Sequence, residues 1–303
     1  MGTTLLLVCS FLSGACGNLF NKWKSNGIKT DTALRYLLYL SLNGLVGAVF
    51  FLFSGGFSLV IDGASLLYGA ICAAGVAGTV LSNVFLLRLS SVAGVHVLIS
   101  AGSILGSAVY GTLLFHEVLD PLRLVRIGIM MLAMLLIFLE KRPATKEAAP
   151  DAKRKSPRPL LALLLLIHLV SSMAFSVAMR YYLLMAETAD SHSLFFLTNL
   201  LSLLGALLLF LVMAPRRRHE VRPSLDMLRP RMLGLVAGST VLSNIGSLIS
   251  AELTPLLDAS ILTPITSAIS ILSAFAVSLL LRERCSRYSI GAMALSLVTV
   301  LLP

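Results

Sequence analysis

The chain has 303 residues, of which 57% are hydrophobic and only 13% are charged, and its formal net charge is +10. A water-soluble globule with a polar exterior could not sustain this balance, so most of the chain is expected to lie in lipid. The positive charge does not indicate nucleic-acid binding, because the basic residues lie in short loops between apolar runs and no soluble domain is left to carry a basic face.

Apolar runs long enough to cross a membrane follow one another along the whole chain. A spanning helix needs roughly 20 predominantly apolar residues. The first run lacks the positive region of a cleaved signal peptide, so we interpret it as a retained helix. The fold class is predicted to be an all-α integral membrane protein of ten transmembrane helices, at residues 3–21, 32–54, 65–88, 92–115, 122–140, 159–181, 192–213, 230–251, 258–281 and 287–302.

The longest polar stretch, residues 141–158, falls at the middle of the chain. It is rich in Lys, Pro and Ala, which is typical of a solvated linker. We therefore predict a first five-helix repeat at 1–140 and a second at 159–303.

An internal repeat supports this division. The segment TVLSN at 79–83 recurs at 240–244, and the same offset pairs Gly44 with Gly205. Because each half has an odd number of helices, the second half is expected to be inverted relative to the first, about an axis in the membrane plane. This is the symmetry that alternating-access transporters use.

The distribution of basic residues predicts an orientation. All of the 24 Lys and Arg residues except Arg123, Arg126 and Arg180 lie on the side of the central linker. Cytoplasmic loops carry the excess of Lys and Arg, so the linker is predicted to be cytoplasmic and both termini to face outward. The expected location is the cell (plasma or inner) membrane, crossed many times.

The same pattern closes the fourth and ninth predicted helices. LFHEVLDP at 114–121 is followed by Ile127-Gly128, and LRERCS at 281–286 is followed by Ile290-Gly291. Each half therefore has a Glu that closes one helix, a short polar turn and an Ile-Gly that opens the next helix. This pattern resembles the EamA-like branch of the drug/metabolite transporter superfamily. Pro264, in the penultimate helix, also matches that family.

The resemblance implies that helices 3, 4, 8 and 9, with contributions from helices 1 and 6, wall a central cavity. The chain departs from the family at Leu98, which stands in place of the proline that would match Pro264, and in three extra residues between Glu117 and Gly128. Pro264 removes one intrahelical hydrogen bond, so it is either a kink that helps gating or a tolerated family proline.

Polar side chains inside the predicted helices are the candidates for solute binding, because polar groups at membrane depth are costly unless paired and mark pathways. Hydrogen bonds between helices remain an equal alternative for the asparagines, and serine and threonine hydroxyls often bond to their own helix. His168 is expected to be structural, whereas the role of His96 stays open. The candidates are Asn83, Asn244, Ser82, Ser243, His96, Ser100, Thr263, Thr266 and Asn18.

Charged residues near the helix ends are expected to have structural roles. Glu117 and Glu283 are expected to cap helices or pair with nearby arginines rather than to touch the solute. The same is expected of four residues whose long or terminal side chains can reach the membrane interface, Arg88, Arg180, Glu252 and Asp258. No Asp or Glu lies in the middle of a predicted helix, so we expect a neutral, amide-rich cavity rather than an acidic site for cationic drugs.

The sequence favours a secondary transporter of a small polar metabolite, whose partners are that solute and the bilayer. No phosphate-binding GxxxxGK[ST] loop is present, and no cofactor or metal site is expected, because the cysteines have no metal-ligand spacing. A lipid flippase or an auxiliary membrane subunit is the alternative. An intramembrane enzyme is less favoured, since HExxH, GxSxG and paired acidic clusters are missing. The substrate, the direction of transport and homodimer formation stay open.

Overall fold

The computed structural model describes residues 3–27, 33–89, 92–118, 120–139, 158–186, 189–280 and 286–302. The fold is all-α in these residues, with eleven α-helices and one short 3₁₀ helix. In chain order they are α1 (Thr3–Gly27), α2 (Ala33–Ser54), α3 (Gly63–Leu89), α4 (Val92–Phe115), α5 (Pro121–Leu139), α6 (Arg158–Met185), α7 (Ser191–Met213), α8 (Arg218–Ser224), η2 (Leu225–Leu228), α9 (Pro230–Leu253), α10 (Ala259–Leu280) and α11 (Arg287–Leu301).

A long helix lies at each of the ten predicted positions. The ends agree to within a few residues, except that α1 continues to Gly27 and α6 to Met185. The stretch between α7 and α9, predicted to be a loop, instead contains α8 and η2. Most of the predicted linker, residues 141–157, lies outside the described part of the chain.

Six helices in the described residues are long and apolar enough to cross a membrane: α2, α3, α6, α7, α9 and α10. Large apolar side chains point outward from them where a soluble protein would place polar ones, which is the expected arrangement for helices in lipid. On α7 the exposed residues are Leu204, Leu207, Leu208, Leu209, Leu211 and Val212. The chain is therefore a helical, multi-pass membrane protein.

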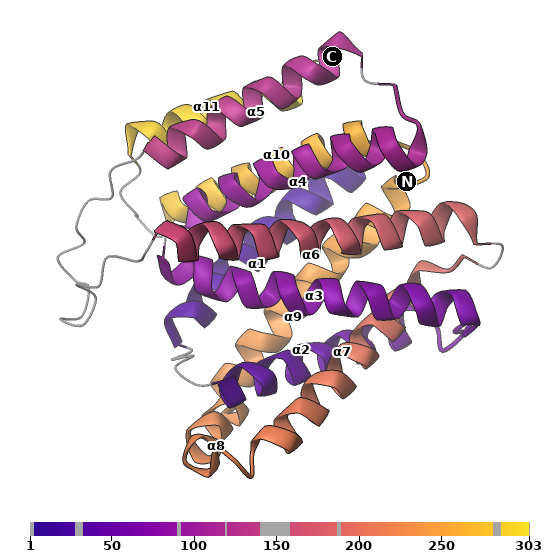
Figure 1. The fold of residues 1–303 in the computed structure, drawn as a ribbon, viewed down its shortest axis with the longest axis vertical. Coiled ribbons are helices and arrows are strands. Elements are labelled where there is room, and N and C mark those ends of the chain that lie inside the picture. The colour runs from indigo at the N-terminus through magenta and orange to yellow at the C-terminus, as the bar shows by residue number, and fades with distance from the viewer. Residues whose placement is uncertain are drawn as a thin grey trace.

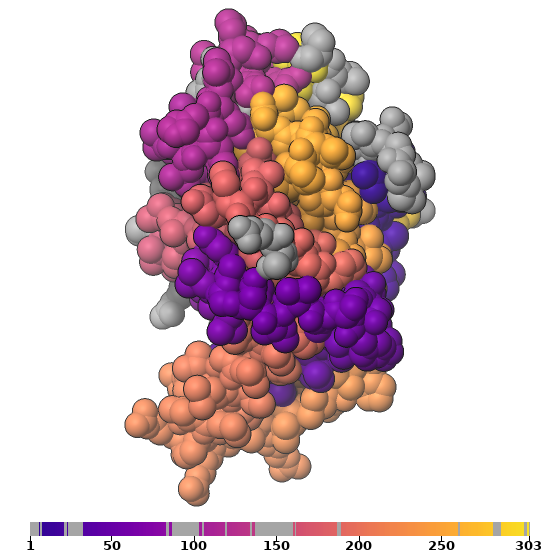
Figure 2. Space-filling model, turned by 90° about the vertical axis from the view of Figure 1, so that its right-hand side faces the viewer, coloured from indigo at the N-terminus to yellow at the C-terminus, as the bar shows by residue number. Residues whose placement is uncertain are grey.

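The long helices lie side by side, with α5 and α11 at one edge and α2 and α7 at the other (Figure 1). The main packed pairs join distant parts of the sequence: α2 with α7, α3 with α6, α1 with α9, α4 with α10 and α5 with α11. Viewed along the helices, segments from the two halves of the chain interleave, so that α10 (orange) lies beside the magenta of α4 and α5 (Figure 2).

Glycines allow the closest of these pairs to form. A Cβ at Gly44 on α2 would lie 2.7 Å from the Asn199 carbonyl oxygen of α7, and a Cβ at Gly75 on α3 would lie 2.8 Å from the Ser171 carbonyl oxygen of α6. These are backbone contacts, which cannot move aside as a flexible side chain can. Small residues at such crossings let helices in lipid approach closely.

Aspartates start several helices at one end of the molecule. Asp190 accepts hydrogen bonds from the first turn of α7, Asp62 accepts one from the Ser65 N–H in α3, and Asp120 accepts one from the Arg123 N–H in α5. A carboxylate in this position satisfies backbone donors that the helix leaves unpaired and interacts favourably with the helix dipole. These caps fix where the helices begin.

The opposite end carries the basic segment Arg216–Arg231, which includes α8 and η2. Arg35, from the first turn of α2, donates to the Pro223 carbonyl oxygen at 2.7 Å, and Met227 is buried against Tyr39 and Val236. The segment is therefore docked onto α2 and α9.

Candidate solute-binding cavity

A cavity of about 230 Å³ lies between α4, α6, α9 and α10. Its described lining residues come from both halves of the chain. They are Ser103 and Tyr110 of α4, Ser172, Met173, Ser176, Met179 and Arg180 of α6, Ser250 of α9, Thr254 just after α9, and Ala259, Leu262, Thr263, Thr266, Ser267 and Ser270 of α10.

Hydroxyl groups are frequent in this lining: ten of the fifteen described residues carry one. Some of these hydroxyls already donate to their own helix, such as Thr254 to the Ser250 carbonyl oxygen at 2.8 Å and Thr266 to the Leu262 carbonyl oxygen at 3.0 Å. Their oxygens can still accept a hydrogen bond from a solute. The cavity therefore offers many hydrogen-bonding groups, although the surrounding helices are apolar on their outer faces.

The end of α4 places a carboxylate next to this cavity. His116 adopts the left-handed conformation (φ 52°), and the following Glu117 N–H donates to the Gly111 carbonyl oxygen at 3.0 Å. A residue in the left-handed conformation just after the last helical turn commonly terminates a helix. A Cβ at Gly111 would lie 2.9 Å from Glu117 Oε2, so the glycine leaves room for the carboxylate to fold back over the last turn.

Glu117 joins three helices in this way. Its Oε1 accepts a hydrogen bond from the Ala259 N–H at the start of α10 (2.8 Å) and lies 3.2 Å from Nη2 of Arg180 on α6. The expectation that Glu117 caps a helix and pairs with an arginine is confirmed.

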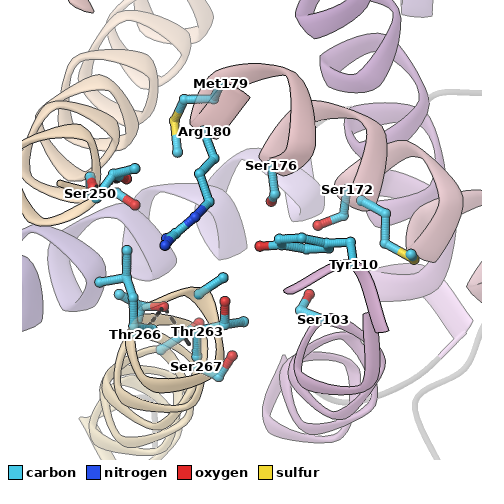
Figure 3. A pocket seen from close by; sticks show the side chains of 15 residues that line it. Ser103, Tyr110, Ser172, Ser176, Met179, Arg180, Ser250, Thr263, Thr266 and Ser267 are labelled. Carbon is cyan, nitrogen blue, oxygen red and sulfur yellow. Dashed lines mark hydrogen bonds between the residues drawn. The ribbon is translucent and has the colours of Figure 1, made fainter. Parts of the chain in front are cut away.

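Arg180 extends from α6 toward α10, and the hydroxyl of Tyr110 points toward it (Figure 3). Its Nη1 donates to the Leu257 carbonyl oxygen at 3.1 Å, and its guanidinium carbon lies 5.2 Å from the centre of the Phe115 ring, within the range of a cation–π contact. These contacts hold the charged end of the side chain at the cavity wall.

The ion pair is buried: the side chains of Arg180 and Glu117 are 8% and 5% exposed. Removing two charges from water is costly, and their attraction compensates only when further hydrogen bonds satisfy them. Nε of Arg180 is buried and has no acceptor among the described residues. An unsatisfied buried donor costs roughly 1–3 kcal/mol. The buried ion pair therefore includes a donor without an acceptor in the described part of the chain.

Of the predicted binding residues, Thr263 and Thr266 line the cavity. Pro264 lies between them in α10 and is buried. Ser243 is exposed on α9. The structure therefore brings only the two threonines into this cavity from the predicted set with described side chains.

The other buried candidates join helices to one another. Asn18 of α1 donates to the Ser273 hydroxyl of α10 at 2.9 Å, and the hydroxyl of Ser82 on α3 is hydrogen bonded to Nδ1 of His168 on α6 at 2.9 Å. His168 thus has the structural contact expected of it. Asn244 is 8% exposed, and its Nδ2 has no partner among the described residues.

The side chains of Asn83, His96 and Ser100 lie outside the described part of the structure, as does Glu283. The predictions for these residues stay predictions.

One expectation is not met by the described residues. Their part of the lining contains no Asn or Gln and is rich in hydroxyls rather than amides, and it includes the charged residue Arg180. The expectation that Arg180 forms a pairing contact is confirmed, because it pairs with Glu117 and its side chain is buried between helices near the end of α6.

A signal in the sequence could have found the missed residues. Ser172, Ser176 and Arg180 are spaced four residues apart and so share one face of α6. On α10, Thr263, Thr266, Ser267 and Ser270 follow the same helical spacing. Polar stripes of this kind in apolar helices identify a face that avoids lipid.

Among the described residues no group of His, Cys, Asp or Glu could hold a metal ion.

The fold and the cavity define the class, a helical multi-pass membrane protein with a hydroxyl-containing cavity between its helices. No protein-family model matches the sequence, and no curated protein matches it. A solved structure, described as "Crystal structure of protein", is similar over 99% of this chain and 95% of that chain, with 16% identity and a TM-score of 0.59. At this identity the likeness shows the fold alone.

Proposed function

We propose that the chain is a secondary transporter that carries a small polar metabolite across the cell membrane by alternating access. The observation that carries this proposal is a hydroxyl-rich cavity with a buried arginine, lined by helices from both halves of the chain. Polar and charged groups inside spanning helices are rare and mark substrate pathways. A cavity of about 230 Å³ is smaller than the roughly 300–1,000 Å³ of pockets for drug-sized ligands, which favours a small solute.

The helix packing supports an arrangement of ten spans in two inverted repeats. Helices α1 to α5 can be matched in order with α6, α7, α9, α10 and α11. If each helix is exchanged for its match, every main packed pair becomes either another packed pair or the same pair. The pair α1–α9 becomes α6–α3, and α4–α5 becomes α10–α11, whereas α2–α7, α4–α10 and α5–α11 are unchanged. A two-fold axis that exchanges the halves would produce this pattern.

The position of the cavity supports a transport site near such an axis. The pair α4–α10 borders it, and this pair is one of those that the exchange leaves unchanged. Rocking of one half against the other about this region would expose the cavity first to one side of the membrane and then to the other. The basic end, with Arg216–Arg231, would be cytoplasmic by the positive-inside bias.

The first test is thermal unfolding of the detergent-purified protein with a panel of amino acids, nucleobases, sugars, amines and organic anions. A ligand that binds only the folded state raises the apparent unfolding temperature. We expect a saturable rise with at least one small solute, followed by uptake of that solute into proteoliposomes without chemical change. No shift and no uptake across the panel would refute this function and favour a lipid flippase or an auxiliary subunit.

A matched pair of variants ties transport to the cavity. Ser176→Leu fills space in the lining, whereas Ser243→Leu places the same side chain on an exposed position of α9. We expect Ser176→Leu to abolish uptake and Ser243→Leu to retain it, at equal amounts of folded protein. Equal uptake by both variants would show that the solute does not pass through this cavity.

A further inference from the structure

We propose that the transported solute carries a carboxylate group and that the guanidinium of Arg180 binds it. The inference rests on the proposed transport function, because it names the chemistry of the solute that occupies the cavity. Arg180 is the one cation among the described lining residues, and its residue exposure is only 7%. A charge held this far from water acts strongly on any group that enters the cavity.

Arg180 keeps hydrogen-bond donors that the protein does not use. A guanidinium has five N–H donors. Within the described part of the chain its partners are the Leu257 carbonyl oxygen at Nη1 and Glu117 Oε1 at Nη2, which leaves the second N–H of each of these two groups for a solute. Nε is buried without a partner there and is not counted among these donors. Glu117 is itself shared, since Oε1 also accepts from the Ala259 N–H. The planar fork of an arginine matches the two oxygens of a carboxylate.

The neighbours of Arg180 define what else the solute can be. Glu117 offsets the charge of Arg180, so a doubly charged phosphate ester would find too little positive charge in the cavity. A single carboxylate adds only one negative charge, and a proton or an ammonium group on the solute can balance it. A solute that is only cationic has no acceptor for the N–H groups of the guanidinium. The hydroxyls of Tyr110, Ser176 and Thr263 can bind a hydroxyl or ammonium group of the same solute.

The entering carboxylate competes with Glu117 for the guanidinium. Because Glu117 also caps α10, a solute that takes over Nη2 loosens the contact among α4, α6 and α10 at the cavity. Binding and movement of the two halves are therefore linked through one side chain.

Four matched probes test the carboxylate requirement by thermal unfolding of the full chain. L-threonine and 3-hydroxybutanoate carry a carboxylate, with and without an ammonium group, and L-threoninamide and 1-amino-2-propanol lack it. We expect a saturable shift with one or both carboxylates and none with the other two; a shift with L-threonine alone assigns the zwitterion. Equal shifts with L-threoninamide, or no shift with either carboxylate at millimolar concentration, overturn the inference.

Variants test the role of Arg180 without leaving a buried unpaired carboxylate. The comparison is between Glu117→Gln and the double variant Glu117→Gln/Arg180→Gln, with Arg126→Gln as a control for loss of a partly buried arginine away from the cavity. We expect Glu117→Gln to bind the carboxylate as tightly as the wild type or more tightly, and the double variant to bind it at least about 30-fold more weakly. Equal binding by the two variants overturns the inference.

These outcomes separate the inference from the function it rests on. If a neutral solute from the wider panel is transported and the double variant transports it as the wild type does, transport stands and the carboxylate inference fails. If nothing is bound or transported by a folded, monodisperse protein, the transport function itself fails.

Discussion

Loss of one partner of the buried Arg180–Glu117 pair is expected to destabilise the protein strongly. At 3.2 Å, two unit charges attract by roughly 5 kcal/mol with an effective dielectric constant of about 20. Desolvation offsets much of this attraction in the intact pair. In a single variant the remaining charge stays buried without its partner, and breaking a buried pair in this way costs about 3–5 kcal/mol. We therefore expect Arg180→Gln to lower the free energy of unfolding by that amount.

The double variant Arg180→Gln/Glu117→Gln should lose much less than the sum of the two single variants. The expected coupling energy is about 2–3 kcal/mol, at the upper end of the range for residues in contact. The assay is unfolding in mixed micelles with increasing sodium dodecyl sulfate, followed by circular dichroism, for the wild type, both single variants and the double variant. Additive effects, with a coupling energy below about 0.5 kcal/mol, would refute the argument that the two charges depend on each other.

Three further predictions concern packing and local backbone. Gly44→Ala places a Cβ against the α7 backbone and should lower the free energy of unfolding by about 1–3 kcal/mol. The repeat-related Gly205→Ala should be close to neutral, because its Cβ meets nothing within 4 Å. Equal effects of the two variants on the unfolding midpoint would contradict the close approach of α2 and α7. His116→Gly should raise the unfolding temperature, because a left-handed backbone costs a non-glycine residue about 1–2 kcal/mol; a lower temperature would argue against that conformation. Ser82→Ala removes the hydrogen bond to His168 and should cost about 0.5–1.5 kcal/mol in the same measurement, and no change would show that the bond contributes nothing.

The sequence by itself determined the helices of this protein. Lipid leaves a backbone no partner other than itself, so an apolar run of sufficient length must be helical, and the ten predicted ranges each contain a long helix. The short helix α8 was missed because its polar, arginine-rich segment carries no apolar run, and its position depends on docking against α2, where Arg35 donates to the Pro223 carbonyl oxygen.

Only the tertiary structure decided which polar residues meet. Asn18 and Ser82 have the same polar character as Thr263 and Thr266, yet the first two are used by hydrogen bonds between helices and the last two line the cavity. The helical spacing of hydroxyls marks a polar face but does not say which helix that face meets. The role of Arg180 was hidden for the same reason: its partner Glu117 lies 63 positions earlier in the chain, and only the packing of α4 against α6 and α10 brings the two charges together in a place that excludes water.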